Sequence, residues 1–192
     1  MSLKFNKHQI ERFSRQIILK DIGTLGQNKI IKSKVLIIGM GGLGCPVAEF
    51  LTRAGVGFIG IIDSDNVDLS NIHRQSLYDI GDLKKSKVIA ARKKLKKINS
   101  KIKVSCHKIR LNKNNYKKIL KKYDYVVDGS DNFKTKFLIN DFCKISKKFL
   151  VSGAISKFDG HIFTFDFKNR NTPCIRSFFQ EKKISDDILN CE

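Results

Sequence analysis

The segment VLIIGMGGLGCPVAEF, residues 35–50, runs from a continuous apolar stretch through closely spaced glycines into a helix-forming sequence. Gly39, Gly41 and Gly44 have the spacing G-x-G-x-x-G. Between a strand and a helix, such a turn lets the backbone approach a phosphate, which the first N–H groups of the helix then face. The segment therefore predicts a phosphate-binding turn, and glycines used only for tight strand–helix packing are the alternative.

Apolar strands alternate with helices along most of the chain. Strands are predicted at 35–38, 58–63, 102–107, 125–128 and 149–153, and helices at 43–53, 86–98, 114–121 and 132–146. This alternation is typical of a mainly parallel sheet with helices on both faces. HIFTFDF (161–167) alternates apolar and polar residues instead, which favours an antiparallel strand with one wet face. The predicted fold class is therefore α/β and Rossmann-like, with a C-terminal antiparallel strand.

Three parts are predicted along the chain: an N-terminal helical arm (1–29), a nucleotide-binding domain (30–170) and an irregular polar tail (171–192). In the arm, Asn6 and Gln9 have the spacing of a capping box. Ile10 and Phe13 are expected to share one apolar face of its helix.

Composition limits the class of protein. Hydrophobic residues make up 41% of the 192 residues, which excludes wholesale disorder and allows one well-cored domain. No apolar run approaches the roughly 20 residues that a membrane helix needs, and MSLKFNKHQIERF does not read as an export signal, so a cytoplasmic location is expected. The five cysteines form no CxxC pair and are expected to be reduced thiols. Cys45, Cys106 and Cys143 fall within predicted elements and are expected to be buried.

The formal net charge is +20 at pH 7 and the pI is about 9.9, a balance that can indicate a nucleic-acid partner. The excess consists of lysines spread over KKSK, RKKLKK, NKNNYKK and ISKK, without interleaved aromatic side chains. This spread favours solvated helix faces over a nucleic-acid module. The positive field also favours an acidic protein partner or an anionic nucleotide.

A dense polar stretch, IDSDNVDLSNIHRQ (62–75), follows the second predicted strand. Asp63 lies 19 residues past Gly44, where a carboxylate can accept a hydrogen bond from a ribose hydroxyl. An NAD enzyme does not require the polar residues after it. An enzyme that acts on a phosphate does require such residues. Asn71 and Arg74, with Lys87 from the next helix, can hold the phosphate oxygens.

DGSDN (128–132) follows the strand YVVD at the edge where α/β sheets bind ligands. Asp128 and Asp131 both lie there, and a carboxylate that faces phosphates at this edge suits Mg²⁺. The alternative is that Asp131 only caps the next helix.

Four motifs, RFSRQIIL, GMGGLGCPVA, DSDNVDLSNIHRQ and DGSDN, occur in this order, and together they resemble the HesA/MoeB/ThiF family of the ubiquitin-activating superfamily. The resemblance covers roughly residues 8–167. It implies a Rossmann-like domain that binds ATP and Mg²⁺ and receives the Gly-Gly tail of a small ubiquitin-like sulfur carrier. Its reaction would convert the tail carboxylate to an acyl-adenylate and release pyrophosphate, in molybdopterin or thiamine synthesis.

The resemblance also implies roles for residues of this chain. The implied nucleotide-binding residues are Gly39, Gly41, Gly42, Gly44, Asp63, Ser70, Asn71, Arg74, Lys87, Asp131 and Asn132. The implied catalytic residues are Arg15, Arg74, Lys87 and Asp131. Asp131 would hold Mg²⁺, and Arg15 would reach across a homodimer to the partner's ATP.

The sequence departs from the family near its C-terminus. The family commonly binds a structural zinc through two CxxC pairs. Here the first pair reads Cys174-Ile175-Arg176-Ser177 and the second would lie beyond Glu192, so no zinc is expected. Some relatives use a cysteine near the position of Cys191 to link covalently to the carrier, but here an incidental terminal thiol is favoured. Relatives also continue past residue 192, so this chain is interpreted as a fragment, a truncated product or a reduced enzyme.

Two further functions stay open. One is a same-fold enzyme that acts on tRNA, of the threonylcarbamoyladenosine dehydratase type, which the basic charge suits. The other is a truncated, non-catalytic nucleotide-binding subunit. An NAD-dependent dehydrogenase is disfavoured because it leaves DLSNIHRQ and DGSDN unexplained. The choice between molybdopterin, thiamine and another sulfur pathway depends on the carrier.

Overall fold

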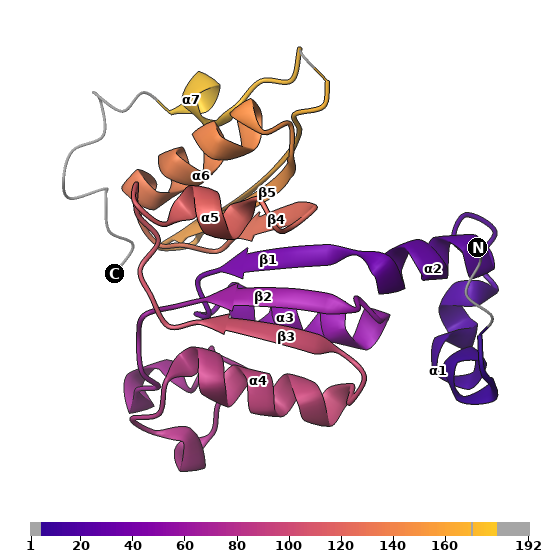
Figure 1. The fold of residues 1–192 in the computed structure, drawn as a ribbon. Helices are drawn as coiled ribbons and strands as arrows, with labels where there is room; N and C mark the ends of the chain where they lie inside the picture. Colours follow the sequence, from indigo (N-terminus) through magenta and orange to yellow (C-terminus); the bar gives the residue numbers. More distant parts are fainter. Residues whose placement is uncertain (1–4, 170, 180–192) are drawn as a thin grey trace.

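The structure, a computed structural model, describes residues 5–169 and 171–179 (Figure 1). Within them, a six-stranded sheet has the order β3-β2-β1-β4-β5-β6. Its strands are β1 (Lys34–Ile38), β2 (Phe58–Ile62), β3 (Lys103–His107), β4 (Tyr125–Asp128), β5 (Phe149–Ser156) and β6 (Asp159–Asp166). The first five strands pair in parallel, and β6 runs antiparallel to β5. The predicted mainly parallel sheet with a C-terminal antiparallel strand is confirmed.

Helices cover both faces of this sheet. They are α3 (Gly44–Ala54), α4 (Lys87–Ile98), α5 (Tyr116–Leu120) and α6 (Phe133–Ile145), with short 3₁₀ turns η1 (Leu69–Asn71) and η2 (Ile80–Asp82). Neighbouring residues of β1 point to opposite faces: Leu36 packs in the core beneath α5 and α6, and Ile37 in the core beneath α3 and α4. Two apolar layers therefore enclose the sheet, which explains the continuous apolar strands in the sequence.

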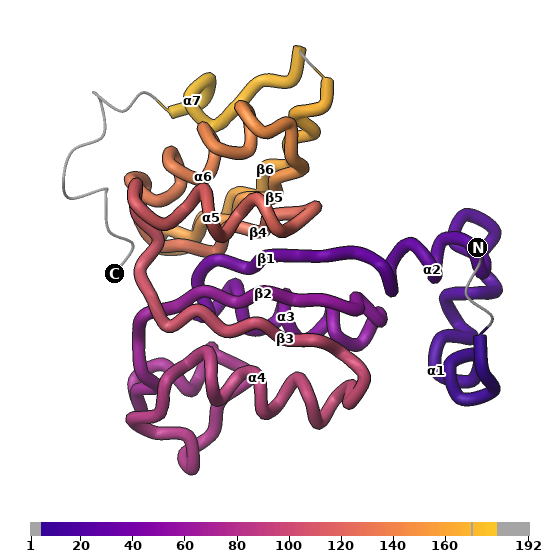
Figure 2. The backbone as a smooth tube through the Cα atoms, in the orientation of Figure 1, coloured from indigo at the N-terminus to yellow at the C-terminus, as the bar shows by residue number. Residues whose placement is uncertain are grey.

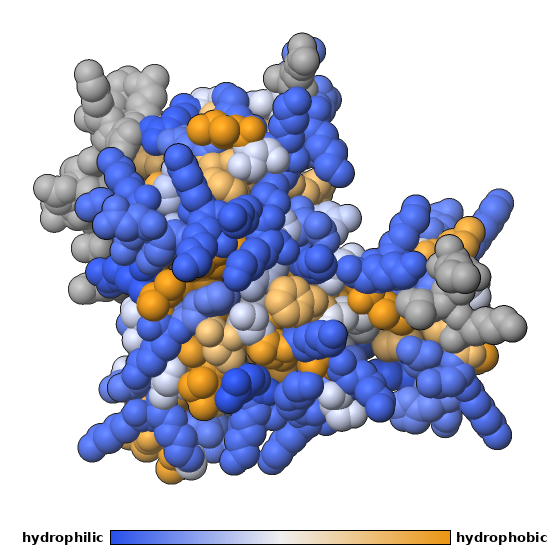
Figure 3. All heavy atoms as spheres, in the orientation of Figure 1, coloured by the Kyte–Doolittle hydropathy of each residue, from blue (hydrophilic) through white to orange (hydrophobic). Residues whose placement is uncertain are grey.

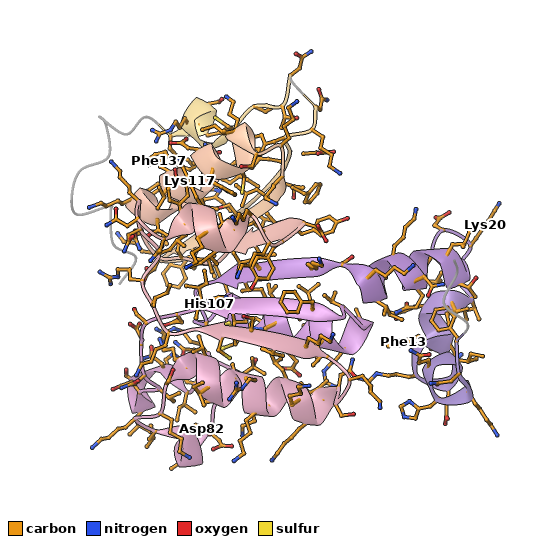
Figure 4. The ribbon with its side chains drawn as sticks, viewed as in Figure 1. Phe13, Lys20, Asp82, His107, Lys117 and Phe137 are labelled. Carbon is orange, nitrogen blue, oxygen red and sulfur yellow. The ribbon has the colours of Figure 1, made fainter. Side chains whose placement is uncertain are left out.

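The arm consists of α1 (Lys7–Ile17) and α2 (Gly23–Lys32) and projects from the end of the sheet where β1 begins (Figure 2). The predicted capping box is present, with Asn6 and Gln9 exchanging hydrogen bonds of 2.9 and 3.1 Å. Phe13 lies on the side of α1 that faces the domain (Figure 4) and packs at Gly55. Ile10, which we expected beside it, is 51% exposed. Only the Phe13 part of that apolar face is covered, because α1 meets the domain at Phe13 and not along its whole length.

The tail was expected to be irregular, but its described part contains the short helix α7 (Ile175–Phe178). Cys174 and Ile175 are buried, and the backbone N–H of Ile175 donates to Asn140 Oδ1 of α6 at 3.0 Å. Two apolar side chains thus hold this segment against α6. The cysteine at 191 lies outside the described residues.

The visible face of the molecule is mostly hydrophilic, with the arm standing apart from the domain (Figure 3). The many lysines account for this surface, and several of them sit on α4 and α5. Among the described residues, none of the helices has both the length and the apolar content to cross a bilayer.

Candidate nucleotide-binding site

A cleft of about 710 Å³ opens at the carboxyl ends of β1, β2 and β4. In parallel α/β sheets this edge is where ligands bind, because the helices that follow the strands begin there. The predicted site residues that line it are Gly39, Gly41, Gly42, Asp63, Asn71, Arg74, Lys87, Asp131 and Asn132. The structure therefore brings together most of the residues that the sequence motifs named.

The glycine turn forms the floor of this cleft between β1 and α3. Gly39 has a φ of +85°, a conformation that favours glycine. Gly41 and Gly42 have room for a ligand, since a Cβ on Gly42 would come no closer than 3.6 Å to the Arg74 side chain. Gly44 does not line the cleft. A Cβ there would lie 1.8 Å from the Gly39 carbonyl oxygen, so Gly44 serves close packing of α3 against the turn.

Asp63 directly follows β2, and its carboxylate faces the glycine turn. Its Oδ2 accepts the backbone N–H of Met40 at 2.8 Å, and its Oδ1 accepts that of Asp65 at 2.8 Å. These bonds fix the side chain. Each carboxylate oxygen can still accept a further hydrogen bond, so Asp63 can take one from a ribose hydroxyl.

One wall of the cleft carries Arg74, which follows η1. Its Nη2 donates to Asn71 Oδ1 at 2.7 Å and its Nη1 to the Ser70 carbonyl at 3.3 Å. The guanidinium is exposed and keeps further donors for an anion. Ser70 does not line the cleft. Its N–H and hydroxyl both donate to Asp68 Oδ1, at 2.8 and 2.6 Å.

Lys87 is the first residue of α4, and only 7% of it is exposed. Its Nζ lies 3.4 Å from Asp65 Oδ2, an ion pair within the cleft. The start of a helix also carries partial positive charge. Lys87, Arg74 and the glycine turn thus provide positive groups for a polyphosphate.

Asp131 and Asn132 form part of the opposite wall, after β4. Asn132 is the residue that caps α6, since its Oδ1 accepts the Thr135 N–H at 2.9 Å. The alternative capping role for Asp131 is therefore wrong. Asp131 Oδ1 accepts only a side-chain N–H of Asn132, at 3.2 Å, and within the described residues Asp131 makes no ion pair.

The donor set of the cleft fits a nucleotide with bound Mg²⁺. No three His, Cys, Asp or Glu side chains in the described part of the chain cluster to hold a metal by themselves. Magnesium is commonly bound through one or two carboxylates together with substrate phosphates and water, and Asp131 supplies such a carboxylate.

Two further residues near the cleft, Gln75 and Lys136, have no role that the sequence motifs predict. Gln75 is buried and lines the cleft, and no donor in the described residues reaches its Oε1. A buried unsatisfied oxygen is costly unless a ligand or water meets it. Its place next to Arg74 was the one signal in the sequence. Lys136 lies beneath the cleft, paired with Asp128 at 3.2 Å.

Arg15 and the C-terminal cysteines lie away from the cleft. Arg15 is on α1, beyond the end of the sheet opposite the cleft, and does not line it. Cys174 is buried, with Lys144 Nζ 3.8 Å from its Sγ. Although burial opposes the effect, hydrogen bonds from Arg176 N–H, Asn140 and Ser177 lower the pKa of the Cys174 thiol. The absence of zinc stays a prediction.

Together, the sheet, the glycine turn and the cleft define a nucleotide-binding protein of the Rossmann-like α/β class. The model of the ThiF family matches residues 13–192. The chain therefore belongs to the ThiF family.

Named relatives agree with this assignment. The adenylyltransferase and sulfurtransferase MOCS3 of Culex quinquefasciatus is 44% identical over 98% of this chain and 42% of that protein. A sulfur carrier protein adenylyltransferase of Thermus thermophilus is 38% identical over 98% of this chain and 71% of that protein. A crystal structure of E. coli MccB with ATP has a TM-score of 0.72 and 25% identity, and covers 92% of this chain and 53% of that chain. This chain spans about two fifths of the MOCS3 relatives.

Proposed function

We propose that this chain is the adenylation domain of a cytoplasmic enzyme that activates a ubiquitin-like sulfur carrier with ATP. The observation that carries the proposal is the convergence of Arg74, Lys87 and Asp131 around the glycine turn. Cations on one wall and a carboxylate on the other suit a triphosphate that carries Mg²⁺. The names of the Culex and Thermus relatives support the carrier as substrate. The four described cysteines are free thiols, which suits the cytoplasm.

In the proposed reaction, the ionised C-terminal carboxylate of the carrier attacks the α-phosphorus of ATP. A bond forms between the carboxylate oxygen and phosphorus, the bond to the β-phosphate oxygen breaks, and pyrophosphate leaves with the electron pair. The attacking group is already ionised, so the chain needs no general base. Catalysis then depends on positioning and on stabilising negative charge.

Different residues of the cleft would orient the ribose, bind the phosphates and hold Mg²⁺. Asp63, fixed by two backbone N–H groups, orients the ribose. Arg74 and Asn71 hold phosphate oxygens from one side, and Lys87 holds them from the start of α4. Bound Mg²⁺ would neutralise phosphate charge, and Asp131 would hold it.

We also propose that the active form is a homodimer in which Arg15 acts on the partner's nucleotide. α1 lies too far from its own cleft to contribute Arg15 there, at the other end of the sheet. On the sheet face opposite α6, Tyr125, Ile155 and Ile162 are 43%, 52% and 80% exposed. Such an apolar surface favours contact with a second copy.

The basic charge supports a second candidate, an enzyme of this fold that acts on tRNA. Binding of tRNA would weaken steeply with salt, because neutralised phosphates release counterions. Binding of a carrier through its Gly-Gly tail would depend less on salt.

ATP–pyrophosphate exchange tests the proposal. Wild-type protein should exchange only with a cognate Gly-Gly-ended carrier, and Arg74→Ala should lower the rate about 100-fold, as loss of an oxyanion donor does. Arg92→Ala, an exposed arginine of α4 outside the cleft, is the matched control and should exchange like wild type. ATP binding without exchange on any carrier would contradict the proposal and favour the non-catalytic subunit. The carrier that supports exchange would identify the pathway, molybdopterin or thiamine.

A further inference from the structure

We propose that the buried pair Lys136 and Asp128 positions the loop 129–132, and with it the Asp131 carboxylate, against the glycine turn. Neither residue lines the cleft, so both would act through the loop and not by touching the nucleotide. This inference rests on the proposed function, because it concerns the placement of the residue that would hold Mg²⁺.

Asp128, the last residue of β4, is fully buried and uses both carboxylate oxygens. Its Oδ1 accepts the backbone N–H and the hydroxyl of Ser130, at 2.9 and 2.6 Å. Its Oδ2 accepts the Ser152 hydroxyl at 2.7 Å and Lys136 Nζ at 3.2 Å. One carboxylate therefore fixes the start of the loop and joins it to β5 and α6.

Lys136 is the fourth residue of α6 and is 3% exposed. Its Nζ also donates to the Gly153 carbonyl of β5 at 2.7 Å. The next residues of β5, Ala154 and Ile155, line the cleft. A single ammonium group thus connects the loop after β4 with the strand that borders the same cleft.

The loop lies directly against the glycine turn. The Gly129 N–H donates to the Ile38 carbonyl at 2.8 Å, and a Cβ on Gly39 would lie 2.6 Å from the Gly129 oxygen. Because backbone touches backbone, a small shift of the loop changes the distance between Asp131 and the turn that would hold the phosphates. The position of Asp131 therefore depends on the hydrogen bonds of Asp128.

Stability is a weak reason to bury this pair. Replacing a buried ion pair with apolar side chains of similar volume is often neutral or stabilising. The Lys136–Asp128 pair instead fixes the position of the loop. The Asp128 carboxylate accepts hydrogen bonds from four donors, and the Lys136 ammonium donates to two acceptors, so the loop that they join has little freedom to move. Such indirect support of a metal ligand is often needed for full metal affinity.

The test compares Lys136→Met, Lys136→Arg and Ser152→Ala with wild type by calorimetric titration of ATP, once with Mg²⁺ and once with EDTA. Lys136→Met should lose about tenfold in affinity for ATP with Mg²⁺, as outer partners of metal ligands do, and less than about twofold in EDTA. Lys136→Arg keeps the charge and should recover most of the loss. Ser152→Ala removes one of the four donors and should show a smaller loss in the same direction.

Lys134→Met is the matched control, since it makes the same substitution on an exposed lysine two residues earlier in α6. It should bind like wild type under both conditions. Equal losses with Mg²⁺ and with EDTA in Lys136→Met would overturn the proposal, since the effect would then be on the fold of the cleft as a whole. If Lys136→Met does not fold, Ser152→Ala decides, and in that variant a loss of ATP affinity that is equal with Mg²⁺ and with EDTA, or no loss at all, would overturn the proposal. Wild-type protein that binds no ATP would contradict the proposed function itself, whereas normal binding with unaltered variants would contradict only this inference.

Discussion

Lys87 Nζ lies 3.4 Å from Asp65 Oδ2, and the two partners differ sharply in exposure: the side chain of the lysine is 8% exposed and that of the aspartate 62%. An ion pair with one solvated partner contributes little to stability. The buried ammonium group nevertheless faces the cleft at the start of α4. The pair therefore holds a cation within the site while it contributes little to the free energy of unfolding.

Lys87→Met should separate binding from stability. Methionine matches the length of the buried stem, and the remaining Asp65 is solvated, so the free energy of unfolding should fall by less than about 1 kcal/mol. Affinity for ATP should fall about 10- to 100-fold, the value of a lost charged hydrogen bond. Urea denaturation and calorimetric titration measure the two effects. Lys93→Met, an exposed lysine of the same helix, should change neither, and unaltered ATP affinity in Lys87→Met would refute the phosphate role.

Two glycines of the same turn should respond differently to alanine. In Gly44→Ala the new Cβ would lie 1.8 Å from the Gly39 oxygen, so α3 must move and the free energy of unfolding should fall by about 3 kcal/mol or more. In Gly42→Ala the nearest atoms lie at 3.6 Å, so the fold should persist while ATP affinity falls about tenfold, or about 1.4 kcal/mol. Thermal unfolding and ATP titration distinguish these outcomes. A Gly44→Ala protein as stable as wild type would contradict the packing role.

The thiol of Cys45 should make stability depend on pH in the alkaline range. Burial raises the pKa of Cys45 to about 11, and its Sγ donates to the Met40 carbonyl at 3.4 Å. Because the folded pKa is raised, the contribution is complete below the unfolded value near 9 and is lost as pH rises toward 11. The advantage of wild type over Cys45→Ala in urea denaturation should therefore be about 1 kcal/mol smaller at pH 10 than at pH 8. If wild type and Cys45→Ala differ in free energy of unfolding by the same amount at pH 8 and pH 10, the predicted effect of the Cys45 thiol is contradicted.

The strands of the sheet could be predicted from the sequence because their local apolar pattern matches their burial in the structure. The continuous apolar run at 35–38 is buried on both faces, as β1 of a parallel sheet must be. The glycine turn also follows from local constraint, since a Cβ on Gly44 has no space. The end of β5 was missed: we expected it at 153, but it runs to Ser156 because residues 154–156 pair with the hairpin partner β6.

Other features depended on contacts between distant residues. A lysine within a helix, as at Lys136, normally indicates a solvated face, and its partner Asp128 ends a strand eight positions earlier. The pattern around Ile10 and Phe13 predicts one apolar face, but only the domain's position decides which of them is covered. In the site, the motifs indicated Asp63, Arg74 and Lys87, whereas the buried unsatisfied oxygen of Gln75 becomes evident only in three dimensions.

Mixed dimers test whether Arg15 acts on the partner subunit. Arg15→Ala and Arg74→Ala chains, co-expressed with different tags, would be purified as a mixed dimer and compared with each variant alone. If Arg15 acts across the interface, the cleft of the Arg15→Ala chain keeps its own Arg74 and receives Arg15 from the other chain. One intact site of the two remains, so pyrophosphate exchange should return to about half the wild-type rate.

Each variant alone should fall about 100-fold, because every site in those dimers lacks one arginine. If Arg15 instead served its own chain, both sites of the mixed dimer would be defective and exchange would stay as low as in the single variants. A control dimer of Arg15→Ala with Arg92→Ala, in which the second substitution lies outside the cleft, should also keep one intact site. Equal activity of the two mixed dimers would support the reach of α1 into the partner's cleft, while recovery in the control alone would show that Arg15 acts within its own chain and would contradict the proposal.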